Sequence, residues 1–176
     1  MSDSTGGDDL GEILREGERT GLQFVRRYGH PIDQVWSAIT ESDQLRAWMP
    51  ADIVGERREG AEIRLPFWPA QVEKYEITET ELTGRIEVWD PPRTFQWTWG
   101  GDVLRFELAA EGDDTTLRFT TWLEPGDREA TGNTAAGYHV CFHALRAWLD
   151  TGVAEPLTEH DHLVHELEPA YAARLD

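Results

Sequence analysis

The sequence predicts an α+β fold in which a curved antiparallel β-sheet wraps around a long C-terminal α-helix, with two short helices after the first strand. Three observations support this prediction. Extended segments with one apolar face follow one another through the middle of the chain, short helical segments precede them, and one long amphipathic segment follows them. A sheet with a single apolar face needs a large cover, and the long helix is the element that can provide it.

The ends of the chain frame one domain. Residues 1–18 are rich in Gly, Ser and Asp, and we expect them to form a flexible acidic leader. Residues 19–152 hold the predicted domain, because no repeat or linker within them indicates a second one. Residues 153–176 are expected to form a C-terminal tail with a short peripheral helix.

The first elements are a strand and two short helices. Residues 21–28 contain several β-forming residues and predict the strand. Pro31 suits the first turn of a helix, and apolar residues recur at helical spacing over residues 32–39. A second short helix, which holds Trp48, ends at Pro50 because proline cannot continue a helix.

Further strands are expected through the middle of the chain. Most of these segments alternate apolar and polar residues, and turns that contain Gly or Pro separate them. The expected strands are residues 53–57, 61–65, 74–82, 84–89, 95–99, 104–108 and 117–121.

The long helix is expected from about Thr131 to Thr151, and Gly152 stands where a C-terminal cap belongs. The face of this helix opposite its apolar stripe carries His139 and His143, which we expect to face solvent. The apolar stripe consists of Tyr138, Cys141, Phe142, Leu145, Trp148 and Leu149.

Composition narrows the classes of function. The formal net charge is −18, which repels phosphate groups and argues against nucleic acid or an anionic membrane as a partner. No apolar run is long enough to span a bilayer, and the N-terminus lacks the pattern of a secretory signal, so we expect a cytoplasmic protein. The single cysteine, Cys141, is expected to be a small buried hydrophobe.

Several segments resemble one known superfamily. The stretch from Arg27 to Thr40 is similar to the opening strand and first helix of START-like, or SRPBCC, proteins. The segments Leu45-Arg46-Ala47-Trp48-Met49 and Gly84 to Trp99 resemble motifs of bacterial relatives of the activator of the ninety-kilodalton heat-shock protein ATPase. Gly137-Tyr138 stands where that group usually has Gly-Trp, and Tyr171 to Leu175 resembles its C-terminal ending.

This resemblance covers roughly residues 20–151 and the tail. It implies the helix-grip fold and a ligand cavity between the sheet and the long helix. It does not imply one activity, because the superfamily includes lipid carriers, hormone receptors, polyketide cyclases and co-chaperone domains.

Large aromatic residues are the candidates for the cavity wall. Aromatic side chains shape pockets, and a few polar groups among them fix the orientation of a ligand. We expect Trp36, Trp48 and Trp68 near the cavity mouth, whereas plain core packing is the alternative for each inward residue. The predicted ligand-binding residues are Trp36, Trp48, Trp68, Trp97, Trp99, Phe106, Phe119, Thr121, Tyr138 and Phe142. The apolar segment 67–70 is a lid over the cavity, a partner contact, or a loop packed against the sheet edge.

No catalytic or metal-binding pattern emerges from the sequence. His139 and His143 have the i, i+4 spacing of metal ligands, but no glutamate stands in the zinc-protease position between them. A second cluster, His160, Asp161, His162, His165 and Glu166, is expected on a solvated helix. We therefore assign no catalytic residue, no metal and no cofactor.

Three functions remain open. The first is binding of a small apolar or aromatic molecule, lipid-like or polyketide-like, between the sheet and the long helix. The second is a cyclase or hydrolase, which needs a titratable group in the same cavity. The third is a co-chaperone-like or stress-response protein, and a homodimer contact is equally open.

Overall fold

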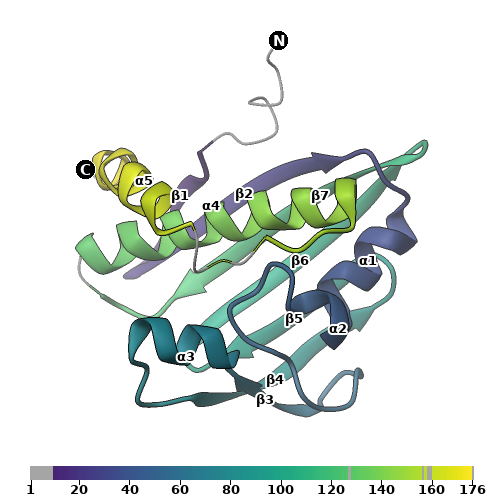
Figure 1. Cartoon of the computed structure of the whole chain (residues 1–176), viewed down its shortest axis with the longest axis horizontal. Helices are drawn as coiled ribbons and strands as arrows, with labels where there is room; N and C mark the ends of the chain where they lie inside the picture. The colour runs from purple at the N-terminus through teal and green to yellow at the C-terminus, as the bar shows by residue number, and fades with distance from the viewer. Residues whose placement is uncertain (1–9, 127, 156, 158–159, 176) are drawn as a thin grey trace.

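The computed structural model describes residues 10–126, 128–155, 157 and 160–175, and it shows a curved antiparallel sheet with a long helix across one face (Figure 1). The strands are β1 Glu12–Glu16, β2 Arg19–Tyr28, β3 Glu62–Pro66, β4 Glu81–Asp90, β5 Thr94–Trp99, β6 Asp102–Glu111 and β7 Asp114–Leu123. The helices are α1 Ile32–Thr40, α2 Ser42–Leu45, α3 Pro69–Tyr75, α4 Arg128–Thr151 and α5 Asp161–Arg174. The predicted helix-grip architecture is confirmed.

The seven strands follow the order β1-β2-β7-β6-β5-β4-β3, and every neighbouring pair is antiparallel. Because side chains alternate between the two faces of a strand, every second side chain points to the face that α4 covers, and these side chains are mostly apolar. In β6, for example, Leu104 and Phe106 are buried. The core therefore lies between this face of the sheet and α4.

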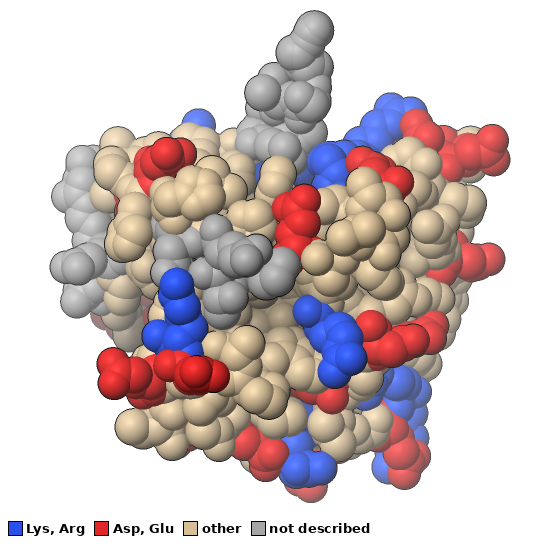
Figure 2. Space-filling model, viewed as in Figure 1, with Lys and Arg blue, Asp and Glu red and all other residues tan. Residues whose placement is uncertain are grey.

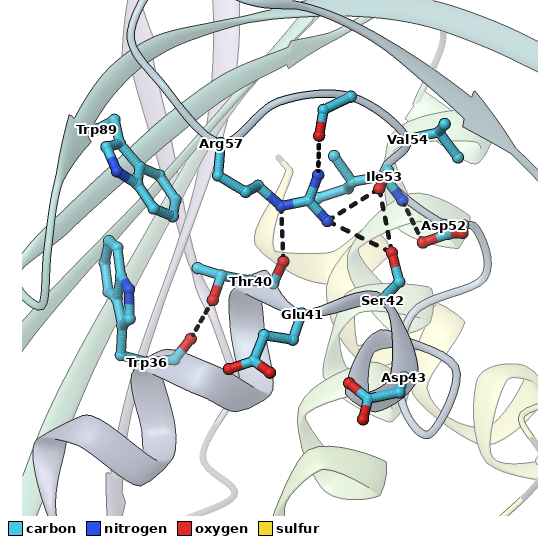
Figure 3. Close-up of a pocket in the computed structure, with 11 residues that line it drawn as sticks. Trp36, Thr40, Glu41, Ser42, Asp43, Asp52, Ile53, Val54, Arg57 and Trp89 are labelled. Atoms are coloured by element: carbon cyan, nitrogen blue, oxygen red, sulfur yellow. Dashed lines mark hydrogen bonds between the residues drawn. The ribbon is translucent and has the colours of Figure 1, made fainter.

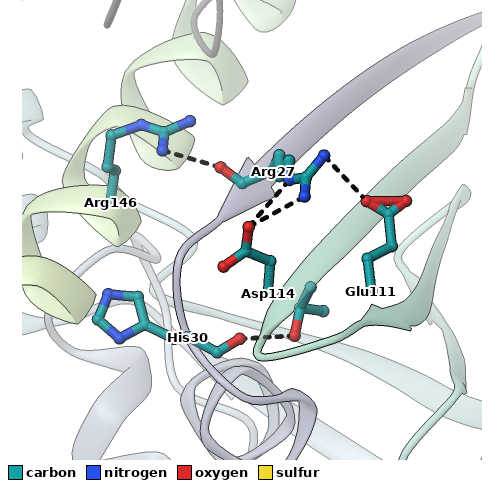
Figure 4. Close-up of polar contacts among 6 residues, drawn as sticks. Arg27, His30, Glu111, Asp114 and Arg146 are labelled. Carbon is teal, nitrogen blue, oxygen red and sulfur yellow. Dashed lines mark hydrogen bonds and ion pairs between the residues drawn. The ribbon is translucent and has the colours of Figure 1, made fainter.

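Polar contacts fasten one end of α4 to the sheet (Figure 4). The Arg146 guanidinium on α4 donates to the backbone oxygen of Arg27 at 3.0 Å and lies over the ring of Tyr28. The Arg27 guanidinium pairs with Asp114 at 3.0 Å and with Glu111 at 3.3 Å, both at the β6–β7 turn. The C-terminal half of α4 is thus held against the end of β2.

Both ends of the described chain are more ordered than expected. The prediction of a flexible leader is wrong for residues 12–16, because Glu12–Glu16 forms β1 and pairs with β2. Residues 1–9 of the predicted leader lie outside the described part of the chain. The expected short peripheral helix is the 14-residue α5, which packs on α4 and buries Tyr171 completely.

Two predicted strands are wrong. Residues 53–57 form a loop, because Gly55 has a positive φ of 146° and the Arg57 side chain bonds the carbonyl oxygens of Ile53 and Gly55 that a neighbouring strand would otherwise bond. Residues 69–75 form α3, because Pro69 stands at a position that favours helix initiation. The strand predicted over residues 74–82 is therefore wrong up to residue 80. Its last two residues and the strand predicted over residues 84–89 form the single strand β4, which begins at Glu81.

Charged side chains of both signs lie on the face of the molecule shown in Figure 2. On the face in Figure 2, acidic and basic side chains are interspersed around a largely uncharged centre. Among the described helices, none has both the length and the apolar character needed to cross a membrane.

Candidate functional site

A cavity of about 400 Å³ lies between α3, α4, α5 and the end of β5. We call it the α4 cavity. Its described lining is Pro50, Gln71, Tyr75, Trp99, Asn133, Thr134, Gly137, Tyr138, Val140, Cys141, Leu157, Val164 and His165. Most of these side chains are apolar or uncharged, and the volume is in the range of pockets that hold drug-sized ligands.

Gly137 creates much of this space. It lies in the interior of α4, where glycine normally weakens a helix, and a Cβ atom built on it meets no atom within 4 Å. The neighbouring Tyr138 and Cys141 form the wall on either side of this gap. The sequence carried a signal for this space, a glycine inside a long helix, but Gly137 was predicted only as part of a family motif.

One side of the cavity carries polar groups. Tyr138 is almost completely buried. Burial has the largest effect and raises the pKa of its hydroxyl, and the negative charge of Asp102 raises this pKa further. A hydrogen bond with Thr121 acts in the opposite direction and lowers it. Burial also raises the pKa of Asp102, while a hydrogen bond from the Glu124 amide partly offsets this effect. Asp102 is a titratable group beside the cavity that the sequence analysis missed.

Cys141 belongs to the apolar wall. Burial raises the pKa of its thiol to about 12, so the group stays protonated at neutral pH and is a poor nucleophile. This agrees with the prediction that Cys141 is a small buried hydrophobe.

The predicted ligand-binding residues fall into three groups. Trp99 and Tyr138 line the α4 cavity, and Thr121 lies beside Tyr138. Trp48, which was predicted near the cavity mouth, is instead buried in the core. It and the inward residues Trp97, Phe106, Phe119 and Phe142 are at most 1% exposed and do not line the cavity. Ring centroids of Phe119 lie 4.8 Å from Phe106 and 5.1 Å from Phe142, so aromatic packing fills the centre of the space between sheet and helix.

The two remaining predicted residues lie elsewhere. Trp68 immediately precedes α3, where its indole nitrogen donates to the backbone oxygen of Met49 and Arg46 lies over its ring. The apolar segment 67–70 is thus part of the α3 start rather than a free loop. Trp36 lines a second hollow, which the α1–α2 turn and residues 52–57 border, and it pairs with Trp89 at a ring distance of 5.2 Å.

This second hollow is an open cleft of about 730 Å³ (Figure 3). Arg57 is its central side chain, and its guanidinium donates to the backbone oxygens of Thr40, Ile53 and Gly55. The carboxylates of Glu41, Asp43 and Asp52 surround it. The donors of Arg57 are used to hold the loop. The cleft is larger than the α4 cavity, but the charged groups in its wall make it less suited to an apolar ligand.

The histidines of α4 do not share one solvated face. His139 is buried, and its Nδ1 atom lies 2.8 Å from the Tyr171 hydroxyl on α5, so the prediction of a solvated His139 is wrong. His143 is partly exposed and lies 3.8 Å from the carboxylate of Glu155, which also lies 3.4 Å from His160. The rest of the predicted C-terminal cluster differs in exposure: His165 is exposed, whereas the His160 side chain is only 12% exposed.

Comparisons with known proteins identify the fold and the family. The model of the family described as "Activator of Hsp90 ATPase homolog 1-like protein" matches residues 29–150. No curated protein matches the chain.

Solved structures show the same fold at low sequence identity. The conserved protein EF2215 from Enterococcus faecalis is similar with a TM-score of 0.78 and 19% identity, over 97% of this chain and 93% of that one. CalU16 from Micromonospora echinospora gives 0.67 and 21%, over 94% and 96%. DynU16, from the dynemicin biosynthetic locus, gives 0.61 and 18%, over 76% of this chain and 48% of that one.

Proposed function

The chain belongs to the family of activator of Hsp90 ATPase homolog 1-like proteins, within the START-like superfamily, and we propose that it binds a small apolar or aromatic molecule in the α4 cavity. The observation that supports this proposal most directly is the gap at Gly137. A long helix that packs only to complete a core has no need of a glycine in its interior beside unfilled space.

The packing around the cavity supports the same function. The centre of the core is filled with rings, whereas the N-terminal half of α4 leaves about 400 Å³ open beside Trp99 and Tyr138. Burial of about 300 Å² of apolar ligand surface contributes roughly 7 kcal/mol before the costs of association, which makes micromolar affinity attainable. The structural similarity to DynU16 from a biosynthetic locus is consistent with a small organic ligand.

Binding of the neutral fluorescent probe N-phenyl-1-naphthylamine tests the proposal. We expect a dissociation constant in the micromolar range, and a Gly137→Leu variant should lose at least about tenfold in affinity, because its side chain occupies the cavity. Leucine favours the helix more than glycine does, so this variant should remain folded.

A Trp89→Phe variant is the matched control, because Trp89 lines the open cleft and not the α4 cavity. Its probe affinity should equal that of the wild type. If Gly137→Leu binds the probe as tightly as the wild type, the α4 cavity is not the binding site. If only Trp89→Phe loses binding, the open cleft is the site instead.

A further inference from the structure

Gln71 has the most buried side-chain amide in the described part of the chain, and the residue is only 9% exposed. Within that part of the chain, no other residue forms a hydrogen bond with its carboxamide. The partly buried glutamines, Gln23, Gln44 and Gln96, each form a hydrogen bond with another side chain. Buried polar groups in folded proteins are nearly always hydrogen-bonded, so the exception at Gln71 needs a physical reason.

The carboxamide of Gln71 belongs to the wall of the α4 cavity. Gln71 and Tyr75 are one turn apart on α3, so they lie on the same face of this helix, and both line the cavity. Neither polar atom of the carboxamide is among the fully enclosed side-chain atoms that lack a partner, so the group keeps some exposed surface. Because the rest of the residue is buried and the residue lines the cavity, this surface faces the cavity.

The start of α3 fixes the position of Gln71. The backbone N–H of Trp68 donates to the carbonyl oxygen of Pro50 at 3.1 Å, and the Trp68 indole donates to the carbonyl oxygen of Met49 at 2.9 Å. Gln71 follows within one turn, where its backbone N–H donates to the carbonyl oxygen of Trp68 at 2.9 Å. A polar group held in this way needs little reordering to bond a ligand, which favours specific recognition.

The rest of the described lining carries little charge. It contains no Lys, Arg, Asp or Glu. Its histidine, His165, has a side chain that is 79% exposed and lies 3.2 Å from the carboxylate of Glu168. A charged ligand group would therefore lose its hydration at Gln71 without gaining a partner of opposite charge. An uncharged hydrogen-bonding group suits this wall better.

We propose that the α4 cavity recognises an uncharged ligand with an amide-type group, whose adjacent N–H and carbonyl oxygen pair with the Gln71 carboxamide. This inference rests on the proposed ligand-binding function and adds the chemical class of the ligand. The glutamine side chain places an accepting oxygen and a donating NH2 group side by side. A lactam presents the complementary pair, so two hydrogen bonds form at once. The apolar part of the lining then holds the remainder of the molecule.

Three planar probes test this recognition by equilibrium dialysis. They are phenanthridinone, which carries a cyclic amide, its N-methyl derivative, which keeps the carbonyl and lacks the N–H, and phenanthrene, which has the same three-ring outline and no polar group. We expect Gln71→Leu to weaken phenanthridinone binding about tenfold relative to phenanthrene, because each neutral hydrogen bond contributes a factor of about two to ten and two are lost. The wild type should bind the N-methyl derivative at least about threefold more weakly than phenanthridinone.

Thermal unfolding distinguishes recognition from a structural role. Gln71→Leu keeps a side chain of similar size that favours a helix, and it removes a buried amide that has no partner among the described residues. It should therefore raise the unfolding midpoint, whereas a structural role for the amide would lower it. Gln34→Leu on α1 is the matched control, because Gln34 is exposed and does not line the cavity. This variant should keep the phenanthridinone affinity of the wild type.

The outcomes separate this inference from the proposed function. If Gln71→Leu and the wild type show the same preference between phenanthridinone and phenanthrene, or if the N-methyl derivative binds as tightly as phenanthridinone, the inference is wrong. It is also wrong if Gln71→Leu lowers the unfolding midpoint and weakens both probes equally, because Gln71 then only supports the fold. If the wild type binds N-phenyl-1-naphthylamine but not phenanthridinone, the cavity binds ligands without recognising an amide. If it binds none of these compounds, the ligand-binding function is overturned as well.

Discussion

The Nδ1 atom of His139 on α4 lies 2.8 Å from the hydroxyl oxygen of Tyr171 on α5. The same hydroxyl accepts a hydrogen bond from the backbone N–H of Gly11 at 2.8 Å. Besides the bond from Gly11, the hydroxyl has a proton and a second lone pair, so it pairs with either tautomer of His139. One side chain thus joins the long helix, the C-terminal helix and the start of the described chain, and it holds α5 where Leu157 and Val164 close the cavity.

Replacement of Tyr171 by Phe should destabilise the protein by about 1–3 kcal/mol, because the buried Gly11 N–H and the imidazole lose this partner. Urea unfolding measures the free energy, and hydrogen exchange at α5 should become faster. Tyr75→Phe is the matched control, since Tyr75 is 45% exposed and should tolerate the change. Equal stability of the two variants would show that the His139–Tyr171 contact does not hold α5.

Replacement of Gly137 by Ala should stabilise the protein by about 0.5–1 kcal/mol and weaken binding of N-phenyl-1-naphthylamine. The added methyl meets no atom and improves helix propensity, but it takes space from the cavity. Gly132→Ala is the control on the same helix. Its nearest atoms, at 3.7 Å, belong to α5, so it should stabilise without changing probe binding. Thermal unfolding and probe titration of both variants test the difference.

Replacement of Gly84 by Ala should destabilise the protein by about 3 kcal/mol. A Cβ atom on Gly84 would overlap the backbone oxygen of Thr98 in β5, so the strands would have to move apart. Gly29→Ala is the matched control, because its nearest atom is 3.9 Å away, and it should stay within about 0.5 kcal/mol of the wild type. An unfolding midpoint of Gly84→Ala equal to that of Gly29→Ala contradicts this account of the β4–β5 contact.

Alkaline pH should destabilise the protein through Cys141. Burial raises the pKa of its thiol from 9.0 to about 12. Below pH 9 the thiol is protonated in both states and stability is unaffected. Between pH 9 and pH 12 the unfolded chain loses a proton that the folded chain retains, so the free energy of unfolding falls by about 1.4 kcal/mol per pH unit.

Urea unfolding at several pH values above 9 tests this dependence against a Cys141→Ala variant, which should show a shallower fall. Burial also raises the pKa of Tyr138 and Tyr171, so some loss of stability at high pH should remain in the variant. Identical slopes for the two proteins mean that the thiol ionises as easily in the folded state as in the unfolded one.

Much of the fold could be predicted from local patterns. Alternation over Phe95, Trp97 and Trp99 correctly predicted β5, and the apolar stripe from Tyr138 to Leu149 correctly predicted the inner face of α4. The family predicted from the order of the motifs is also confirmed. These signals survive because a strand or helix that faces a core must repeat its apolar residues at a fixed period.

Two of the failures share one physical cause. The loop at residues 53–57 is held in part by a bond from Arg57 to the backbone oxygen of Thr40, 17 residues away, and the burial of His139 depends on Tyr171, which is 32 residues away. No local pattern records such contacts. The same holds for the cavity. Trp97 and Trp99 are both tryptophans on the inward face of β5, so the sequence pattern does not distinguish them, but only Trp99 lines the cavity.

The sequence by itself determined the class of fold, the family and the set of large side chains that point inward, because these follow from periodicity and from residue types at each position. The tertiary structure alone decided which of those side chains fill the core and which border a cavity. That choice depends on volumes: rings from β5, β6, β7 and α4 pack together at the centre of the sheet, whereas Gly137 leaves space beside the N-terminal half of the helix.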